Sequence, residues 1–447
     1  MVKLADVIPF RGIRYNREIV PDLAEVVIPP YDVITPQAQK DFYERNKHNA
    51  VRLDFGVTAE GDTETENRYT RAAGALDQWL QEGIMVQDPE PAIYCLREEY
   101  LTLQEKAAVR DAVIAAVRLT DFSEGRIIPH EETSGAPKQD RLKLMEATEA
   151  NLSPIFCLYH DPEHAVTEIL QKIREGEPDL MLTDERGTRH SLWKTSDPEA
   201  ISAICELLAS REILIADGHH RYETALAYRE QRRSADKSPE GDQPYDFVMA
   251  YLAEIDSARE SILPIHRFIY GLSWDTVAEL PGLFEEKFEV RTMPETGARG
   301  RQIMMSAMSS AGQDHNVFGL RLPGDDSYHI LLGRDPRPML TEQQNGHSDA
   351  YRSLDVAVLD HLILTDILEI SPGGINEDAA VEFVAQSRAE AAETDNREVQ
   401  AIFYVRAPSM EDISTVTASG YRMPRKSTFF YPKPLTGLVF RSLKNGL

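Results

Sequence analysis

The stretch "ILIADGHHRYETALAYR" spans residues 213–229 and joins an apolar run to a helical pattern through five polar or charged positions. Its first part, "ILIA", is rich in β-branched residues, which predicts a buried strand. The part from "YETALAYR" onward spaces Tyr222, Leu226 and Arg229 as a helix does and contains good helix formers. Between them "DGHHR" must turn the chain sharply, and Gly218 supplies the conformational freedom that such a turn needs.

This turn is expected to bind an anion. A helix that starts after Gly218 points its unpaired N–H groups and the positive end of its dipole back at the turn. His219, His220 and Arg221 add side-chain donors to those amides, which favours a phosphate ligand. Two other interpretations stay open: Asp217 as a helix N-cap beside ordinary surface histidines, or a metal site. Adjacent histidines seldom converge on one ion, and no thiolate lies nearby, so the metal is disfavoured.

The composition is that of a folded, soluble protein with more than one lobe. The chain has 447 residues, more than one core usually absorbs, and its 42% hydrophobic and 27% charged residues are ordinary values. We find neither a membrane span nor the apolar run of a signal peptide, and therefore expect a cytoplasmic protein without a membrane partner. Three scattered cysteines favour reduced thiols over a disulfide framework.

The net charge of −26 disfavours nucleic acid as a partner, because most of the surface repels phosphate backbones. An anionic ligand must then be met by a local cluster of cations and N–H groups. The oligomeric state stays open.

Strand and helix patterns alternate along the chain, which predicts a mixed α/β, multi-lobed fold. Antiparallel hairpins are expected at 92–119 and 316–333. Helices are expected at 36–46, 66–83, 140–151, 163–176, 197–210, 354–368 and 376–394, and surface loops at 230–244 and 333–349. Boundaries near 125, 272 and 350 give four parts: an N-terminal α/β lobe (1–125), a binding core (126–272), a hairpin-containing insertion (273–350) and a C-terminal segment that returns to the site (351–447).

A second polar constellation lies in "GRIIPHEETSGAPKQDRLKLMEATEANLSPIF" (125–156), on a loop that leads into a helix. Its functional interpretation is a second half-site, with Glu131 or His130 as proton acceptor and Lys138 or Arg141 as charge neutralisers. The alternative is a plain capped helix with Asp140 at its N-terminus.

Two further segments complete the candidates. "MPRKSTFFYPKPLTGLVF" (423–440) contains hydroxyls and cations that suit a carboxylate or phosphate, and its aromatic residues favour a docked segment over a solvated tail. The candidate ligands there are Arg425, Lys426, Ser427 and Thr428. In "IPPYDVITPQ" (28–37), Asp32 is either a turn former or a carboxylate held in a cleft.

Taken together, "PPYDVI", "HEET", "DRLKLMEATEANLSPIF", "IADGHHRYETALAYR", "LPIHR" and "MPRKSTFFYPKPLTGLVF" resemble the domain of unknown function 1015 family along almost the whole chain. That family is similar, locally, to the ParB and sulfiredoxin superfamily, which includes kinases of free serine. The resemblance implies a ParB/sulfiredoxin-like nucleotide-binding core with additional helical elements. It also implies that Asp217, Gly218, His219, His220 and Arg221 contact nucleotide phosphates.

The implied activity is phosphoryl transfer from ATP or ADP to the hydroxyl of a small amino acid such as L-serine, with Mg²⁺ arriving with the nucleotide. Asp32 or Glu131 is preferred over Asp217 as the base. Arg425, Lys426 and Thr428 are expected to hold the substrate. Two alternatives are a phosphoester hydrolase in which His130 protonates the leaving group, and a nucleotide-binding regulator without enzymatic activity.

Overall fold

The computed structural model describes residues 6–103, 105–133, 135–237, 239–255, 262–322, 327–341, 346–370, 380–395 and 398–444. The chain forms two compact units. Unit 1 comprises residues 1–129, 133–260 and 432–447, and unit 2 comprises residues 130–132 and 261–431. The mixed α/β class predicted from the sequence is confirmed, whereas the four-part division stays a prediction.

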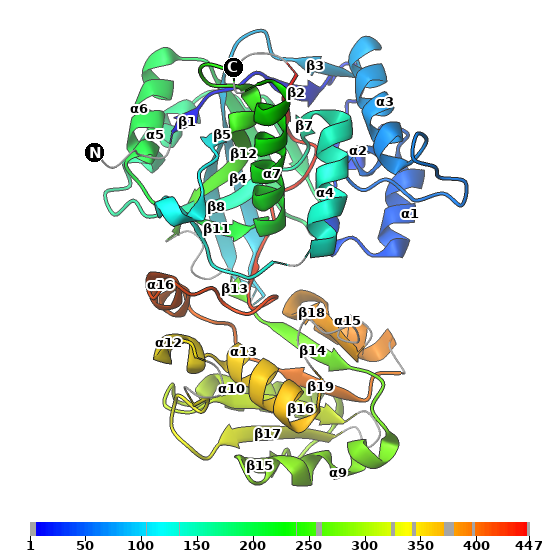
Figure 1. The fold of residues 1–447 in the computed structure, drawn as a ribbon, viewed down its shortest axis with the longest axis vertical. Coiled ribbons are helices and arrows are strands. Elements are labelled where there is room, and N and C mark those ends of the chain that lie inside the picture. The colour runs from blue at the N-terminus through cyan, green and yellow to red at the C-terminus, as the bar shows by residue number, and fades with distance from the viewer. Residues whose placement is uncertain are drawn as a thin grey trace. The chain divides into compact units, whose positions relative to one another are not determined.

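A nine-stranded sheet forms the centre of unit 1, in the order β6-β11-β8-β12-β5-β4-β10-β9, with β1 beside β5 (Figure 1). The pairs β6/β11 and β8/β12 are parallel, and the other pairs are antiparallel. The strands are β1 (Val7–Ile8), β4 (Ile93–Leu101), β5 (Ala107–Arg118), β6 (Ile127–Pro129), β8 (Ile155–Tyr159), β9 (Leu180–Thr183), β10 (Arg189–Thr195), β11 (Ile213–Asp217) and β12 (Phe247–Glu254). Strands β4 and β5 confirm the hairpin predicted at 92–119.

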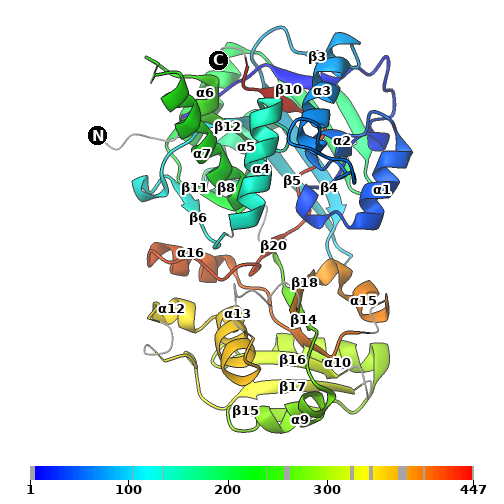
Figure 2. The same ribbon diagram turned by 45° about the vertical axis from the view of Figure 1, so that its right-hand side comes forward.

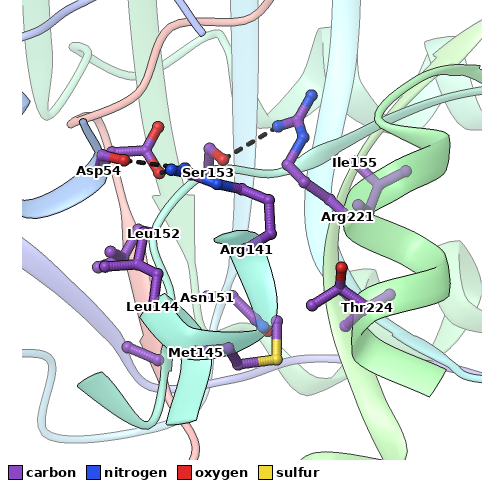
Figure 3. Close-up of a pocket in the computed structure, with 12 residues that line it drawn as sticks. Asp54, Arg141, Leu144, Met145, Asn151, Leu152, Ser153, Ile155, Arg221 and Thr224 are labelled. Atoms are coloured by element: carbon purple, nitrogen blue, oxygen red, sulfur yellow. Dashed lines mark hydrogen bonds and ion pairs between the residues drawn. The ribbon is translucent and has the colours of Figure 1, made fainter. Parts of the chain in front are cut away.

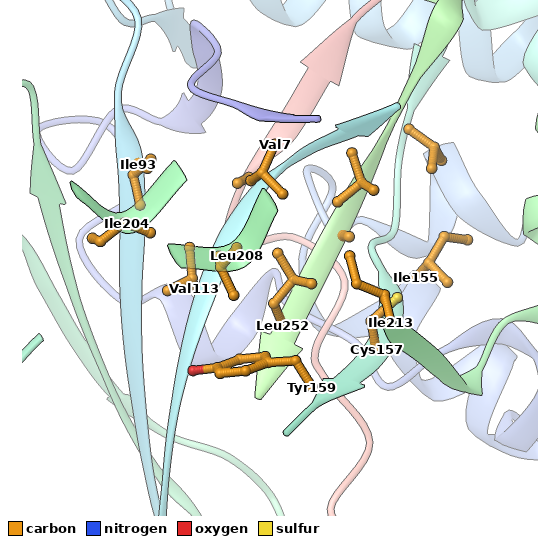
Figure 4. Packing of buried hydrophobic residues seen from close by; sticks show 14 of the residues in the cluster. Val7, Ile93, Val113, Ile155, Cys157, Tyr159, Ile204, Leu208, Ile213 and Leu252 are labelled. Carbon is orange, nitrogen blue, oxygen red and sulfur yellow. The ribbon is translucent and has the colours of Figure 1, made fainter. Parts of the chain in front are cut away.

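Helices of unit 1 cover one face of this sheet. Side chains from α5, α6 and α7 share one apolar cluster with the strands, and Figure 4 shows Ile204 and Leu208 of α6 over Val113 and Leu252. All residues of strand β12 are buried, so its side chains are covered on the other face of the sheet as well. The helices are α1 (Pro36–Arg45), α2 (Val51–Asp54), α3 (Arg68–Gln81), α4 (Gly135–Thr148), α5 (Ala165–Ile173), α6 (Pro198–Ala209) and α7 (His219–Ala235).

The end of the chain completes unit 1. Strand β21 lies between β2 and β7 in a second, four-stranded sheet with the order β3-β2-β21-β7. Its strands are β2 (Gly12–Tyr15), β3 (Met85–Gln87), β7 (Ala150–Asn151) and β21 (Phe440–Ser442). Leu435, Leu438 and Val439 before β21 are buried, so this part of the chain is docked, as predicted, and is no solvated tail.

Unit 2 is built on a six-stranded antiparallel sheet, in the order β15-β17-β16-β19-β14-β18, and a short β13/β20 pair (Figures 1 and 2). Its strands are β13 (Ile262–Leu263), β14 (Ile265–Ile269), β15 (Phe288–Thr292), β16 (Val317–Leu322), β17 (Ser327–Gly333), β18 (Val381–Ala385), β19 (Ala401–Tyr404) and β20 (Phe429–Phe430). Its helices are α9 (Trp274–Phe284), α10 (Gly297–Ser310), α12 (Asp349–Arg352), α13 (Asp355–Val358), a π-helical stretch (Leu359–Ile367), α15 (Gln386–Asp395) and α16 (Met410–Ala418). The β16/β17 pair confirms the second predicted hairpin.

Three sequence predictions of local structure were wrong. The helix expected at 376–394 is interrupted by β18, because the β-favouring "VEFVA" pairs with β14; residues 376–379 lie outside the described residues. The loop expected from 230 begins as helix, since α7 continues to Ala235. Helix α4 begins at Gly135, so Asp140 lies inside the helix and cannot cap its N-terminus. None of the helices in the described ranges is long and apolar enough to cross a membrane.

Leu252→Ala should destabilise the protein by about 2–5 kcal/mol, because the fully buried side chain leaves a cavity in the central strand β12. Denaturant unfolding measures the change. Val109→Ala on β5 is the control, since that side chain is 49% exposed and its loss should cost no more than about 0.5 kcal/mol. Equal losses for the two variants would contradict the assigned core.

His266 on β14 should make stability depend on pH. Burial lowers its pKa to about 4, and its Nδ1 accepts the Val405 N–H, which fixes the neutral ring. As the pH falls, His266 is therefore protonated in the unfolded chain before it is protonated in the folded protein. The free energy of unfolding should be constant above about pH 6.5 and decrease by about 3 kcal/mol as the pH falls to 4. His266→Gln should flatten this part of the pH profile in urea unfolding, whereas exposed His160→Gln should not. A His266→Gln profile that keeps the wild-type slope would refute this assignment.

Candidate functional site

The turn that opens the sequence lies between β11 and α7, as predicted. Gly218 adopts φ +96° and ψ 25°, in the left-handed region, and is the N-cap of α7. A Cβ at this position would lie 3.0–3.1 Å from the Arg221 guanidinium. Two features therefore favour glycine at position 218: the left-handed backbone conformation and the close approach of the Arg221 guanidinium. His219 is buried, whereas Gly218 and His220 are half-buried.

Asp217, the last residue of β11, is held by two cations instead of capping the helix. Its Oδ2 accepts from Arg221 Nη2 at 2.7 Å, and its Oδ1 accepts from Lys433 Nζ at 2.5 Å. Arg221 is fixed further by Nη1, which donates to Ser153 Oγ at 3.0 Å and to the Pro154 carbonyl at 2.6 Å. The N-cap interpretation of Asp217 is therefore wrong.

Lys433 joins the turn at Asp32 to the end of β11. Its Nζ donates to Asp32 Oδ2 as well as to Asp217 Oδ1, both at 2.5 Å. The ammonium group is almost fully buried; burial acts to lower its pKa, but the two carboxylates outweigh burial and raise the pKa above its ordinary value. Lys433 lies in the segment 423–440 but is not among the candidate ligands that the sequence predicts there. Its position between Pro432 and Pro434 was the available signal.

Asp32 lies in the single helical turn Tyr31–Val33, after the proline pair 29–30. Both interpretations of Asp32 are thus compatible with the structure, since the residue forms the turn and presents its carboxylate to Lys433. Next to it, the Tyr31 ring lies against Arg141, whose Cζ is 4.0 Å from the ring centroid. Burial raises the pKa of Tyr31 to about 12, despite the opposing effect of Arg141.

Arg141 on α4 is buried beside two carboxylates. Its Nη1 lies 3.2 Å from Asp54 Oδ1, and its Nη2 lies 2.6 Å from Asp140 Oδ2. Burial raises the pKa of Asp54 and would raise that of Asp140 too, but Arg141 beside Asp140 lowers the latter. The predicted charge neutraliser Arg141 therefore already neutralises residues of the protein.

A small cavity lies between Arg141 and Arg221, as Figure 3 shows. Ser153 and Asp54 line it beside the two arginines, and Leu144, Met145, Leu152, Ile155 and Val248 form an apolar part. The space open to the centres of water-sized molecules is about 40 Å³, which accommodates a few atoms and no nucleotide. The cavity thus adjoins the turn and is too small for a whole nucleotide.

Lys138 lies at the start of α4, which runs beside α7 in both ribbon views (Figures 1 and 2). Its Nζ lies 2.9 Å from Glu223 Oε2, and the same carboxylate accepts from Thr133 Oγ1 at 2.7 Å. Lys138 therefore ties α4 to α7, and Thr133 ties the loop before α4 to the same carboxylate.

The remaining candidates come together within unit 2. His130 is fully buried, and its Nε2 lies 2.8 Å from Thr428 Oγ1. Glu131 Oε1 accepts the Lys426 N–H at 2.8 Å, and the Ser427 hydroxyl donates to the Pro424 carbonyl at 2.5 Å. Arg425 is half-buried. The two motifs at 130–132 and 423–428 are thus partners, whereas Lys138 and Arg141, expected beside His130 and Glu131, belong to unit 1. The second half-site stays a prediction.

The candidate residues therefore form two groups. Unit 1 brings together Asp32, Asp217, Gly218, Arg221 and Lys433, with Arg141 and Lys138 on the neighbouring α4. Unit 2 brings together His130, Glu131, Lys426, Ser427 and Thr428. Within the part of the chain that the structure describes, no three or more His, Cys, Asp or Glu side chains gather to hold a metal ion.

Comparison with known proteins gives one family. The family model "Protein of unknown function (DUF1015)" matches residues 7–357. None of the curated proteins matches the chain.

Among solved structures, a free serine kinase in complex with AMP is similar at 12% identity and a TM-score of 0.32, covering 71% of this chain and 86% of that one. A conserved hypothetical protein from Pyrococcus furiosus is similar at 12% identity and a TM-score of 0.34, covering 75% and 97%. SbnI with a C-terminal truncation, from Staphylococcus aureus, is similar at 11% identity and a TM-score of 0.31, covering 72% and 85%.

Gly218→Ala should destabilise the protein by about 1–2 kcal/mol, since a Cβ is strained in the left-handed region. The loss should be larger if the Arg221 guanidinium cannot move aside. Gly74→Ala, inside α3 with open space around it, is the matched control and should be neutral or stabilising. Unfolding in urea compares them, and a Gly218→Ala protein as stable as the wild type would contradict the described turn.

Proposed function

We propose that this chain, which belongs to the DUF1015 family, is a small-molecule kinase that transfers a phosphoryl group from ATP or ADP to a free amino acid. The acceptor that we propose is the hydroxyl group of L-serine, and the product is O-phosphoserine. One observation carries the proposal: Lys433 joins the carboxylates of Asp32 and Asp217 at the glycine turn where α7 begins.

The turn provides what a phosphate group needs. The first N–H groups of an α-helix have no intrahelical partner, and their dipole favours negative charge. Arg221 and Lys433 add two cations whose positions are fixed by Asp217. We therefore assign the phosphates to the amides of residues 218–221, with the side chains of His219 and His220 beside them, in a ParB/sulfiredoxin-like core around β11 and α7.

Asp32 is the base that we favour. Its carboxylate is held by an ammonium group that a phosphate would also attract, so the phosphate competes with Asp32 for Lys433. Released from that contact, Asp32 can accept the proton of the acceptor hydroxyl. Glu131 is the second candidate, but its carboxylate holds a backbone amide of unit 2.

The reaction then needs little covalent work from the protein. The serine oxygen forms a bond to the terminal phosphorus, the bond from that phosphorus to the leaving nucleotide oxygen breaks, and the hydroxyl proton goes to the Asp32 carboxylate. Lys433 and Arg221 stabilise the charge on the transferred group. Mg²⁺ would offset the phosphate charge, held by Asp217 with water and phosphate oxygens, since this ion uses few protein ligands. The substrate contacts of Arg425, Lys426, Ser427 and Thr428 stay predictions.

Purified protein with Mg²⁺, L-serine and ATP or ADP should form O-phosphoserine, measured by mass spectrometry. Asp32→Asn should lower kcat about 10²–10⁴-fold, because a general base is lost. Asp41→Asn, exposed on the adjacent α1, should retain wild-type activity.

Other outcomes would redirect or refute the proposal. Release of inorganic phosphate without an acceptor would favour a hydrolase. A larger loss in Glu131→Gln than in Asp32→Asn would move the base to Glu131. Inactivity with both nucleotides and with every hydroxyl amino acid would remove the kinase proposal.

A further inference from the structure

A fully buried ion pair lies on the face of the nine-stranded sheet opposite α5, α6 and α7. Arg110 on β5 and Glu98 on β4 have no exposed side-chain surface. Glu98 Oε2 accepts from Arg110 Nε at 2.9 Å and from Nη2 at 2.6 Å, and it also accepts from the Tyr251 hydroxyl. Two neighbouring strands and β12 therefore fix the guanidinium group.

Aromatic rings enclose the same guanidinium. Its Cζ lies 4.7 Å from the centre of the Phe156 ring, 5.3 Å from Tyr251 and 5.9 Å from Tyr100. Such contacts add cation–π attraction and leave the group little freedom to move. Phe156 is also the strand partner of Asp217, which places this enclosure next to the candidate site.

The guanidinium reaches the segment that contains Lys433. Arg110 Nη2 donates to the Pro432 carbonyl at 2.5 Å, across 322 positions of the chain. Prolines on both sides of Lys433 restrict the backbone, since each fixes its own φ and limits the residue before it. Anchoring the Pro432 carbonyl therefore anchors the backbone from which the Lys433 ammonium reaches Asp32 and Asp217.

Stability alone is a poor reason for this ion pair. Taking both charges out of water costs most of what their attraction returns, and an apolar pair of similar size is often as stable. Moreover, Arg110 Nη1 and Glu98 Oε1 are buried without a hydrogen-bond partner among the described residues. The desolvation of the Arg110 guanidinium therefore indicates a role other than stability, and its hydrogen bond to the Pro432 carbonyl indicates that this role concerns the segment containing Lys433.

We propose that Arg110, oriented by Glu98, is a positioning residue that holds Lys433 between Asp32 and Asp217. Neither Arg110 nor Glu98 touches the reacting groups in this assignment, and both act through the Pro432 carbonyl. The catalytic part of the inference rests on the proposed kinase function, whereas the positioning of Lys433 does not.

The chain offers a matched control one position along the same two strands. Arg97 and Asp111 form a bidentate ion pair, in which Nε lies 2.8 Å from Oδ1 and Nη2 lies 2.9 Å from Oδ2. Because successive side chains of a strand alternate between faces, this pair lies on the other face of the sheet, away from Pro432. Removing it alters the same strand pair but leaves the Lys433 segment anchored.

The test measures how fast acetic anhydride labels Lys433, by mass spectrometry, relative to exposed Lys40. In Glu98→Met/Arg110→Met the ammonium should leave its carboxylates, and labelling should rise about tenfold, the effect of one pKa unit on the unprotonated fraction. Arg97→Met/Asp111→Met should label Lys433 at the wild-type rate. Unchanged labelling in a folded Glu98→Met/Arg110→Met protein would overturn the proposal, as would an equal rise in the control.

Arg110→Lys keeps the charge for Glu98 and serves if the double variant does not fold. A single ammonium lacks the planar fork that joins Glu98 to Pro432, so Lys433 labelling should again rise, although less. Labelling at the wild-type rate in Arg110→Lys and in Arg110→Gln would overturn the proposal.

If the wild type is a kinase, the Glu98→Met/Arg110→Met and Arg110→Lys variants should lose about 10²-fold in kcat/KM for the nucleotide, with a lower kcat, because a displaced Lys433 weakens contacts to the phosphate, most of all in the transition state. A rise in KM at constant kcat would contradict the catalytic part. A wild type without kinase activity would remove the proposed function, and the labelling result would still decide the positioning of Lys433.

Discussion

One buried ammonium group organises unit 1. Lys433 stands between two carboxylates that would repel each other without it, and those carboxylates come from a turn near residue 32 and from the end of β11. Because burial makes an unpaired charge very costly, the three groups must assemble together. The C-terminal segment, the N-terminal turn and the glycine turn before α7 are therefore parts of one arrangement.

The sequence was most informative where local rules are strong. The strand, glycine turn and helix at 213–229 follow from β-branched residues, a glycine and helix formers, and the structure contains them in that order. Docking of the C-terminal segment followed from its aromatic residues. The strand at 381–385 was missed because "VEFVA" sits inside a helix-like composition, and only its pairing with β14 decides its conformation.

Partners distant in sequence could not be predicted. Asp217 fitted an N-cap by position, yet its side chain pairs with Arg221 and with a lysine more than two hundred residues away. Asp140 fitted a helix cap and Arg141 a charge neutraliser of a second half-site, whereas Arg141 is buried against Tyr31 and Asp54 and pairs with Asp140. Local patterns do not report which charges meet in a folded core, and the buried Arg110–Glu98 pair left no sequence signal at all.

Unit 1 combines residues 1–129 and 133–260 with residues 432–447, and this arrangement affects how the protein folds during synthesis. The whole of residues 261–431 is translated before residues 432–447, which supply Lys433 and β21 to unit 1. Domains usually fold as they emerge from the ribosome, N-terminal parts first. Unit 1 must therefore wait for residues 432–442. A chain that stops before them has Asp32 and Asp217 without their shared lysine and lacks the strand between β2 and β7.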